Sequence, residues 1–304
     1  MNVKDIKKID IHAHATPFPE YAPIQFTGER FVSAEEVIAF YDELNIEQGV
    51  LLPLSSAEWH DEQFTSSDCK YLVDKHPGRF LWFCNVDPRA VEHSPKADLS
   101  RILNHYKSLG AKGVGEVTAQ LYFDDPMMDN LFHHCEMCDL PVTIHIAPKQ
   151  GDYYGIVDEL GLPRLEKMLK KHKNLKILGH SQCFWSQMGD NVDEENRFFF
   201  PKGKVQNGRI PQLMREYGNL YCDFSANSGM NALMRDPEHA ARFIEEFSDR
   251  VLYGCDICNP SNRHQYQFND FLNKMLADKM ISEENYYKIV RGNAIKLLGL
   301  KDTE

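Results

Sequence analysis

The stretch Ile9-Asp10-Ile11-His12-Ala13-His14 decides the fold, because it combines a short β-branched strand with two metal-ligand side chains. Side chains alternate along a strand, so His12 and His14 point the same way, with their Cα atoms about 6.6 Å apart. Two imidazoles at that spacing can bind one metal ion. The alternation also predicts the other orientations, with Asp10 on the histidine face and three side chains facing the surrounding helices: Ile9, Ile11 and Ala13.

Seven further apolar runs resemble this strand, since most are short, rich in β-branched or aromatic residues, and bounded by Gly, Pro, Asn or Asp. The eight predicted strands are Lys8–His14, Gln48–Leu54, Phe80–Val86, Ala111–Val117, Pro141–Ile146, Leu175–His180, Asn219–Phe224 and Arg250–Cys255. Amphipathic stretches with helical spacing separate them, and Ser33-Ala34-Glu35-Glu36 has the pattern of a capping box before one such stretch.

Strands that alternate with helices indicate a parallel sheet, and eight such units in 304 residues predict one (β/α)₈ barrel domain over 1–304. A doubly wound open sheet is the alternative. That fold normally has a glycine-rich turn after its first strand, whereas here the first strand ends in His-Ala-His-Ala-Thr-Pro. Gln182–Arg209 is too long for an ordinary connection and carries several aromatic residues, so we expect a lid or substrate wall after the sixth strand.

The composition excludes several classes of function. The formal net charge is -11, and an acidic surface disfavours nucleic acid as a partner. No stretch has the roughly 18 uninterrupted apolar residues of a membrane span, and the amino terminus lacks the pattern of a signal peptide. The 8 cysteines are scattered through a long chain, which favours reduced thiols and a cytoplasmic location.

Four more metal-ligand side chains lie at or just after the carboxyl ends of predicted strands: Glu116, His145, His180 and Asp256. In a barrel these strand ends meet on one face, where active sites lie. The sequence therefore predicts that all four gather around His12 and His14. Imidazole and carboxylate ligands suit Zn²⁺, with Mn²⁺ as an alternative, and such an ion activates water.

This pattern resembles the amidohydrolase superfamily along the whole chain, and most of all the amidohydrolase-related branch that includes aminocarboxymuconate semialdehyde decarboxylase. His76-Pro77-Gly78-Arg79-Phe80, Val86-Asp87-Pro88 and the closing Asn293-Ala294-x-x-Leu297-Leu298 are similar to that branch too. The resemblance implies a small-molecule substrate and a homo-oligomer, such as a dimer.

The resemblance also implies roles for the ligands. His12, His14 and Asp256 would hold a first ion, which His145 joins in single-metal members while His180 contacts water or substrate. In two-metal members His145 and His180 hold a second ion and a residue at the position of Glu116 bridges the pair. Two ions are slightly favoured here, and Asp256 is expected to act as general acid and base.

Other polar and aromatic residues that follow the strands are candidates for contacting substrate: Trp59, His60, Arg89, Lys149, Tyr153, Trp185, Asn227, Asn259 and Arg263. The Cys-x-x-Cys pairs at Cys135 and Cys255 are expected to be structural, since no second close pair completes a zinc site.

The leading functional prediction is a hydrolase that attacks an ester, lactone or amide carbon with metal-activated water. Non-oxidative decarboxylation of a small unsaturated or aromatic acid uses the same site and is the alternative. A metal-binding barrel without catalysis and a metal-dependent deoxyribonuclease are the other hypotheses, and the acidic charge weighs against the last.

Overall fold

The barrel strands follow the prediction closely. The structure is a computed structural model that describes residues 6–59 and 64–302. In this part of the chain each predicted run overlaps one strand of the barrel: β1 (Lys8–Ala13), β2 (Ile46–Leu51), β3 (Phe80–Trp82), β4 (Val114–Val117), β5 (Val142–Ala147), β7 (Ile177–His180), β8 (Leu220–Asp223) and β9 (Val251–Leu252). The short β6 (Ile156–Val157) pairs in parallel with the end of β5, in the loop that follows it.

The strands form two parallel sheets that hydrogen bonds join into a closed barrel. One sheet has the order β1-β2-β3 and the other β4-β5-β7-β8-β9. Between β3 and β4, the Cys84 amide donates to the Gly113 carbonyl at 2.9 Å and the Gly115 amide donates to Cys84 at 2.8 Å. Between β1 and β9, the Ile11 amide donates to the Tyr253 carbonyl at 3.0 Å. The predicted (β/α)₈ barrel is therefore confirmed.

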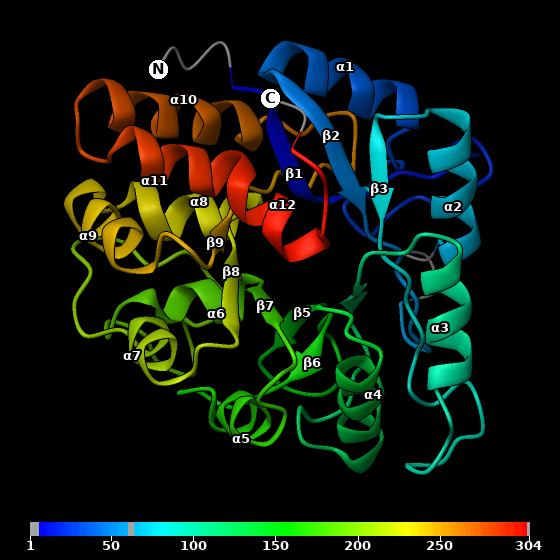
Figure 1. Ribbon diagram of the computed structural model, residues 1–304. Coiled ribbons are helices and arrows are strands. Elements are labelled where there is room, and N and C mark those ends of the chain that lie inside the picture. Colours follow the sequence, from blue (N-terminus) through cyan, green and yellow to red (C-terminus); the bar gives the residue numbers. More distant parts are fainter. Residues whose placement is uncertain (1–5, 60–63, 303–304) are drawn as a thin grey trace.

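Helices surround the strands (Figure 1). Their bounds are α1 (Ala34–Leu44), α2 (Ser66–Lys75), α3 (Ser100–Ser108), α4 (Pro126–Met137), α5 (Pro163–Lys171), α6 (Gln182–Trp185), α7 (Arg209–Glu216), α8 (Ala226–Met234), α9 (Pro237–Phe247), α10 (His264–Ala277), α11 (Glu283–Tyr287) and α12 (Asn293–Leu298), with a π-helical turn at Lys288–Gly292. The predicted capping box is present at α1, where Ser33 accepts from the Glu36 amide and Glu36 accepts from the Ser33 amide. Among the described residues, no helix is long and apolar enough to cross a membrane.

The predicted side-chain directions in the first strand are wrong for the residues that precede its histidines. Asp10 on β1 pairs with Gly49 on β2, and Ala13 pairs with Leu51. Two residues of β1 therefore lie between these pairs but only one residue of β2, so β1 carries one extra residue. Such a bulge shifts the alternation of side chains. Asp10 consequently faces α1, where its carboxylate accepts a hydrogen bond from the Tyr41 hydroxyl at 2.8 Å.

The barrel interior is a separate apolar cluster. It includes Ile9 and Ile11, which were predicted to face the helices, together with side chains from four other strands or strand ends: Val50, Leu52, Phe83, Leu178 and Leu252. A Cβ atom at Gly113 would lie 2.5 Å from the Phe83 ring, so this glycine leaves the space that the ring fills. Ala294 and Leu298 of α12 join the same cluster, so this helix covers the end of the barrel opposite the histidines.

Lys8 is buried at the start of β1 and should make stability depend on pH. Its side chain is 3% exposed, and its ammonium donates to the Leu44 carbonyl at 2.7 Å, at the carboxyl end of α1. Burial lowers the pKa of Lys8 from 10.5 to about 8. Between these values the unfolded chain binds more protons than the folded one, so the free energy of unfolding rises with pH, by about 3 kcal/mol in total.

We expect Lys8→Met to remove this rise, whereas Lys7→Met, at the exposed neighbouring position, should keep it. Urea denaturation of both variants and the wild type at several pH values from 7.5 to 10.5 measures the difference. The cysteines and tyrosines that titrate in the same pH range are present in both proteins. Subtracting the free energies of unfolding of Lys8→Met from those of the wild type therefore leaves the contribution of Lys8. Parallel curves for Lys8→Met and wild type would contradict the prediction.

Candidate metal centre

The six predicted ligand residues lie together at the carboxyl end of the barrel. Nε2 of His12 and Nε2 of His14 are 3.0 Å apart. One oxygen of Glu116, from β4, lies 3.6 Å from His12 Nε2 and 3.5 Å from His14 Nε2. On the other side, an oxygen of Asp256, which follows β9, lies 3.3 Å from His14 Nε2. Four potential ligands therefore surround one small space.

A second set of potential ligands shares Glu116 with the first. Its other carboxylate oxygen lies 2.7 Å from Nδ1 of His145 on β5 and 3.8 Å from Nε2 of His180 at the end of β7. Three overlapping groups have ligand atoms within 4.8 Å of one another: His12, His14 and Glu116; His12, His180 and Asp256; Glu116, His145 and His180. None of the groups found in the described residues contains a cysteine.

The hydrogen bonds behind the histidines show that the site fits a cation. Nδ1 of His12 lies 2.6 Å from the Asp223 carboxylate, and Nδ1 of His14 lies 2.9 Å from the Leu52 carbonyl. Because both partners accept hydrogen bonds, each Nδ1 carries the proton and each Nε2 of a neutral ring presents its lone pair. Two Nε2 atoms 3.0 Å apart, with carboxylates beside them, favour positive charge between them, which either a proton or a metal ion that replaces it can supply.

The charges of the site follow from burial and from these contacts. Burial would lower the pKa of His12, but Asp223 and Asp256 outweigh it and hold this pKa well above its usual range. Burial would raise the pKa of Asp256, but His12 and His14 outweigh it and lower the pKa to about 2. For His180, burial and the nearby His12 lower the pKa to about 4. Asp256 is therefore ionised and His180 neutral near pH 7, the forms that bind metal ions.

Two supporting residues on or just after β8 were not predicted from the sequence. Asp223 orients His12, and the Ser225 hydroxyl lies 2.9 Å from Nδ1 of His180. Asp223 is fully buried near the end of an apolar strand. A carboxylate is costly at such a position without a partner, and this was the signal that could have found it. Trp185, a predicted substrate residue, is buried behind the site, where its indole donates to the Asp223 carbonyl at 3.1 Å.

A cavity of about 300 Å³ opens over the ligands and includes Glu116, His145 and Asp256 in its wall. The segment predicted as a lid or wall contributes Gln182, Phe198 and Phe200. The cavity also has lining residues that were not predicted: Gln25, Phe26, Phe31, Leu54, Tyr154, Ser228, Asn262 and His264. Most of these come from loops after strands, where aromatic and amide side chains in the sequence were the available signal.

The predicted substrate residues fall into two groups. Asn227 and Asn259 line the cavity. The others described are not among the lining residues, and their contact with substrate stays a prediction: Trp59, Arg89, Lys149, Tyr153, Trp185 and Arg263. His60 lies outside the described residues.

In the second group, Trp59 and Lys149 both contact Tyr153, which in turn contacts the cavity residue Phe198. The Trp59 indole donates to the Tyr153 carbonyl at 2.8 Å. The ammonium of Lys149 lies 5.5 Å from the centre of the Tyr153 ring, whose edge packs against Phe198 with 4.7 Å between ring centres. Arg263 is exposed and donates to the Pro260 carbonyl at 3.1 Å.

Arg197 fixes the wall segment to the loops after β5. Its guanidinium, 2% exposed, donates to the carbonyls of Asp158 at 2.8 Å and Pro148 at 2.5 Å. We expect Arg197→Ala to lower the free energy of unfolding by about 2 kcal/mol, since two carbonyls lose a charged donor. Chymotrypsin should cut between residues 189 and 207 at least about tenfold faster. Lys202→Ala, at an exposed position of the same segment, is the control, and equal cleavage of both variants would refute this role of Arg197.

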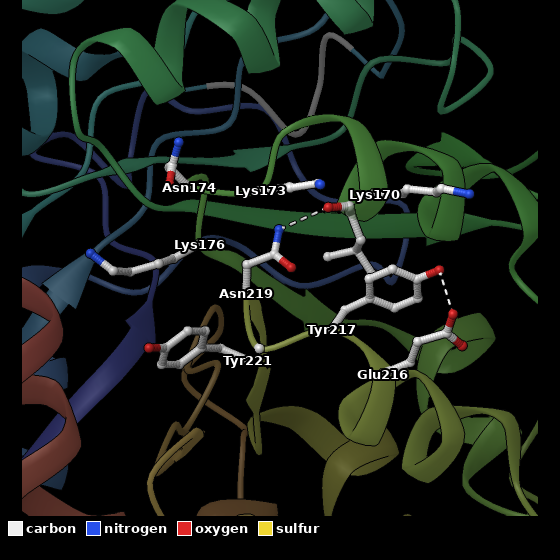
Figure 2. A pocket seen from close by; sticks show the side chains of 10 residues that line it. Lys170, Lys173, Asn174, Lys176, Glu216, Tyr217, Asn219 and Tyr221 are labelled. Carbon is white, nitrogen blue, oxygen red and sulfur yellow. Dashed lines mark hydrogen bonds between the residues drawn. The ribbon is translucent and has the colours of Figure 1, made fainter.

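A larger hollow, of about 530 Å³, lies away from the metal ligands (Figure 2). It is bordered by the end of α5, the end of α7 and the residues that lead into β7 and β8, at the opposite end of the barrel. Lys170, Lys173 and Lys176 line it, but the buried amide of Asn219 is already bound to three backbone carbonyls. This hollow contains no member of the ligand set.

A closed barrel with histidines and carboxylates at its carboxyl end has the architecture of the metal-dependent barrel enzymes. The chain matches the family model described as Amidohydrolase over residues 9–300, and it belongs to this family. It is thus an enzyme of the amidohydrolase superfamily, as the sequence resemblance implied. Among curated proteins no relative matches it.

Solved structures share the fold at low identity. A probable 2-pyrone-4,6-dicarboxylic acid hydrolase from Acinetobacter baumannii is 15% identical, with a TM-score of 0.59 and coverage of 97% of this chain and 100% of that one. The 5-carboxyvanillate decarboxylase from Sphingomonas paucimobilis is 17% identical, with a TM-score of 0.63 and coverage of 98% and 100%. A dihydroxybenzoic acid decarboxylase from Polaromonas sp. JS666 is 18% identical, with a TM-score of 0.58 and coverage of 96% of each chain.

Proposed function

We propose that this chain is a metal-dependent hydrolase that cleaves an ester, lactone or amide bond of a small molecule. The observation that carries the proposal is the position of Glu116, whose two oxygens face two different histidine groups. A carboxylate in this position can bridge two ions, and two ions favour hydrolysis because they can stabilise both the attacking and the leaving oxygen. A hydrolase is also among the structures that share the fold.

In this proposal, His12, His14 and Asp256 would hold the first ion, His145 and His180 would hold the second, and Glu116 would contribute to both. The donor set suits Zn²⁺ or Mn²⁺. The dihydroxybenzoic acid decarboxylase noted above contains bound manganese, which supports the second choice. A divalent ion at this site would supply Lewis acidity and lower the pKa of water there.

Asp256 is the proposed general acid and base. It lines the cavity, and its side chain is 21% exposed, so it can reach both water and substrate. It accepts a proton from the water that adds to the carbonyl carbon and gives this proton to the leaving oxygen or nitrogen as the C–O or C–N bond breaks. Ser225 holds Nδ1 of the neutral His180, which keeps Nε2 directed at the site.

Decarboxylation remains the second candidate, because decarboxylases share the fold and the same residues would bind a carboxylic acid. The test removes metal with a chelator, reloads Zn²⁺ or Mn²⁺, and measures both lactone or ester hydrolysis and CO₂ release from hydroxybenzoates. Hydrolysis only after reloading supports the proposal. Metal-dependent CO₂ release without hydrolysis would replace it with the second candidate, and the absence of both reactions would contradict the proposal.

Two further predictions, on the cellular location and on the oligomeric state, accompany this function. A cytoplasmic location is inferred from the 8 cysteines scattered through a long chain, since reduced thiols are typical of that compartment. The dimer is implied only by the resemblance, and sedimentation analysis would test it.

A further inference from the structure

The wall of the cavity above the metal ligands is apolar or neutral. Five aromatic side chains line it: Phe26, Phe31, Tyr154, Phe198 and Phe200. Five amide side chains supply most of its polar groups: Gln25, Gln182, Asn227, Asn259 and Asn262. Others are Thr27, Ser228 and His264, whose Nε2 already lies 2.5 Å from the Cys255 carbonyl. Among the described residues that line the cavity, none is lysine or arginine.

Arginines near the cavity are already neutralised by other groups. Arg89 pairs with both Glu58 and Asp87. Arg30 pairs with Glu36 at 2.6 Å. Arg197 binds backbone carbonyls and contacts Glu194 at 2.7 Å. None of these guanidinium groups lines the cavity. Arg263, between the lining residues Asn262 and His264, is directed to the carbonyls of Pro260 and Asn262 and over the ring of Phe40. A charged group of a ligand would therefore find no lysine or arginine among the described residues of the wall.

This composition limits the substrate. One anionic or polar group can bind at the metal ions, but a carboxylate farther out would lose water beside phenylalanine rings and gain no ionic partner. Flat aromatic walls instead favour a planar apolar group. Amide side chains can donate to, or accept from, neutral carbonyl, ether or hydroxyl oxygens at its edge.

We propose that the substrate is uncharged and planar in the part that lies beyond the metal ions, as in a neutral aryl or unsaturated ester or lactone. This substrate class rests on the proposed function, since it names the molecule that the same site would hydrolyse.

A pair of matched ligands tests the proposal without turnover. Benzohydroxamate binds metal ions through its hydroxamate and places its ring in the cavity, whereas 4-carboxybenzohydroxamate adds one distal charge. Calorimetric titration of the zinc-loaded wild type should give a dissociation constant at least about 30-fold weaker for the carboxylated ligand. Equal or tighter binding of the carboxylated ligand would overturn the proposal.

Two neighbouring substitutions provide the variant and its control. Phe200 lines the cavity and is 44% exposed, so Phe200→Arg can place a cation at the rim without disturbing the core. It should bring the two dissociation constants to within about fivefold of each other. Phe199 is 63% exposed and does not line the cavity, so Phe199→Arg should leave the ratio as in the wild type. Equal effects of both variants would show a long-range charge effect and would also overturn the proposal.

The two proposals fail in different ways. Preference for the neutral ligand together with an absence of hydrolysis would refute the hydrolase, but it would still support a pocket that binds an uncharged group beyond the metal ions. Hydrolysis with a preference for substrates that carry a distal carboxylate would refute the substrate class alone.

Discussion

Asp256→Asn is expected to lower kcat/KM by about three orders of magnitude on the ester or lactone that the reloaded wild type hydrolyses. Asparagine has nearly the same shape but cannot accept the proton of the attacking water or return it to the leaving group. It also removes one negative charge beside His14, whose Nε2 lies 3.3 Å from the carboxylate. The turnover of wild type and variant should be compared at equal metal content, so that weaker binding of the ion is not mistaken for lost catalysis.

Asp236→Asn is the matched control for this experiment. Asp236 is buried, but it caps α9 and pairs with Lys204 at 3.1 Å, and it is not among the residues that line the cavity. We expect its replacement to lower stability and leave kcat/KM within about twofold of the wild type. If Asp256→Asn retained wild-type turnover with a full complement of metal, its assignment as general acid and base would be wrong.

The sequence predicted the barrel because its periodic signals are local. Each strand is a short apolar run, and the helix signals between runs depend only on neighbouring residues, as in the Ser33 capping box. The metal ligands could be predicted for a related reason. Once strands are placed, parallel geometry alone brings their carboxyl ends together, so Glu116 and His145 had to approach His12.

What the sequence could not predict depends on contacts between distant residues. The bulge in β1 arises from its pairing with β2, and it reversed the predicted side of Asp10. Asp223 supports His12 from a strand more than 200 residues away, and no local pattern marks that contact. Arg89 was a reasonable candidate for a substrate carboxylate, but only the fold shows that Glu58 and Asp87 surround its guanidinium.

Glu116→Gln is expected to reduce the bound metal from two ions per chain to one. Glu116 is the one carboxylate that belongs to both the group with His12 and His14 and the group with His145 and His180. With glutamine, the His145 group loses its anionic ligand, whereas the His12 group keeps Asp256. Elemental analysis after dialysis against a weak chelator counts the ions, and calorimetric titration of the metal-free protein measures each affinity.

Glu136→Gln serves as the control for the loss of a carboxylate beside a histidine. Glu136 lies 3.3 Å from Nδ1 of His172, on the outer helix α4, and does not line the cavity. Its replacement should leave the ion count unchanged. If the wild type holds a single ion and Glu116→Gln keeps it, Glu116 does not bridge. The site would then match the single-ion arrangement, in which His145 joins the first ion and His180 is free to contact substrate. That arrangement lacks the second ion that favours hydrolysis, and decarboxylation becomes the better supported reaction.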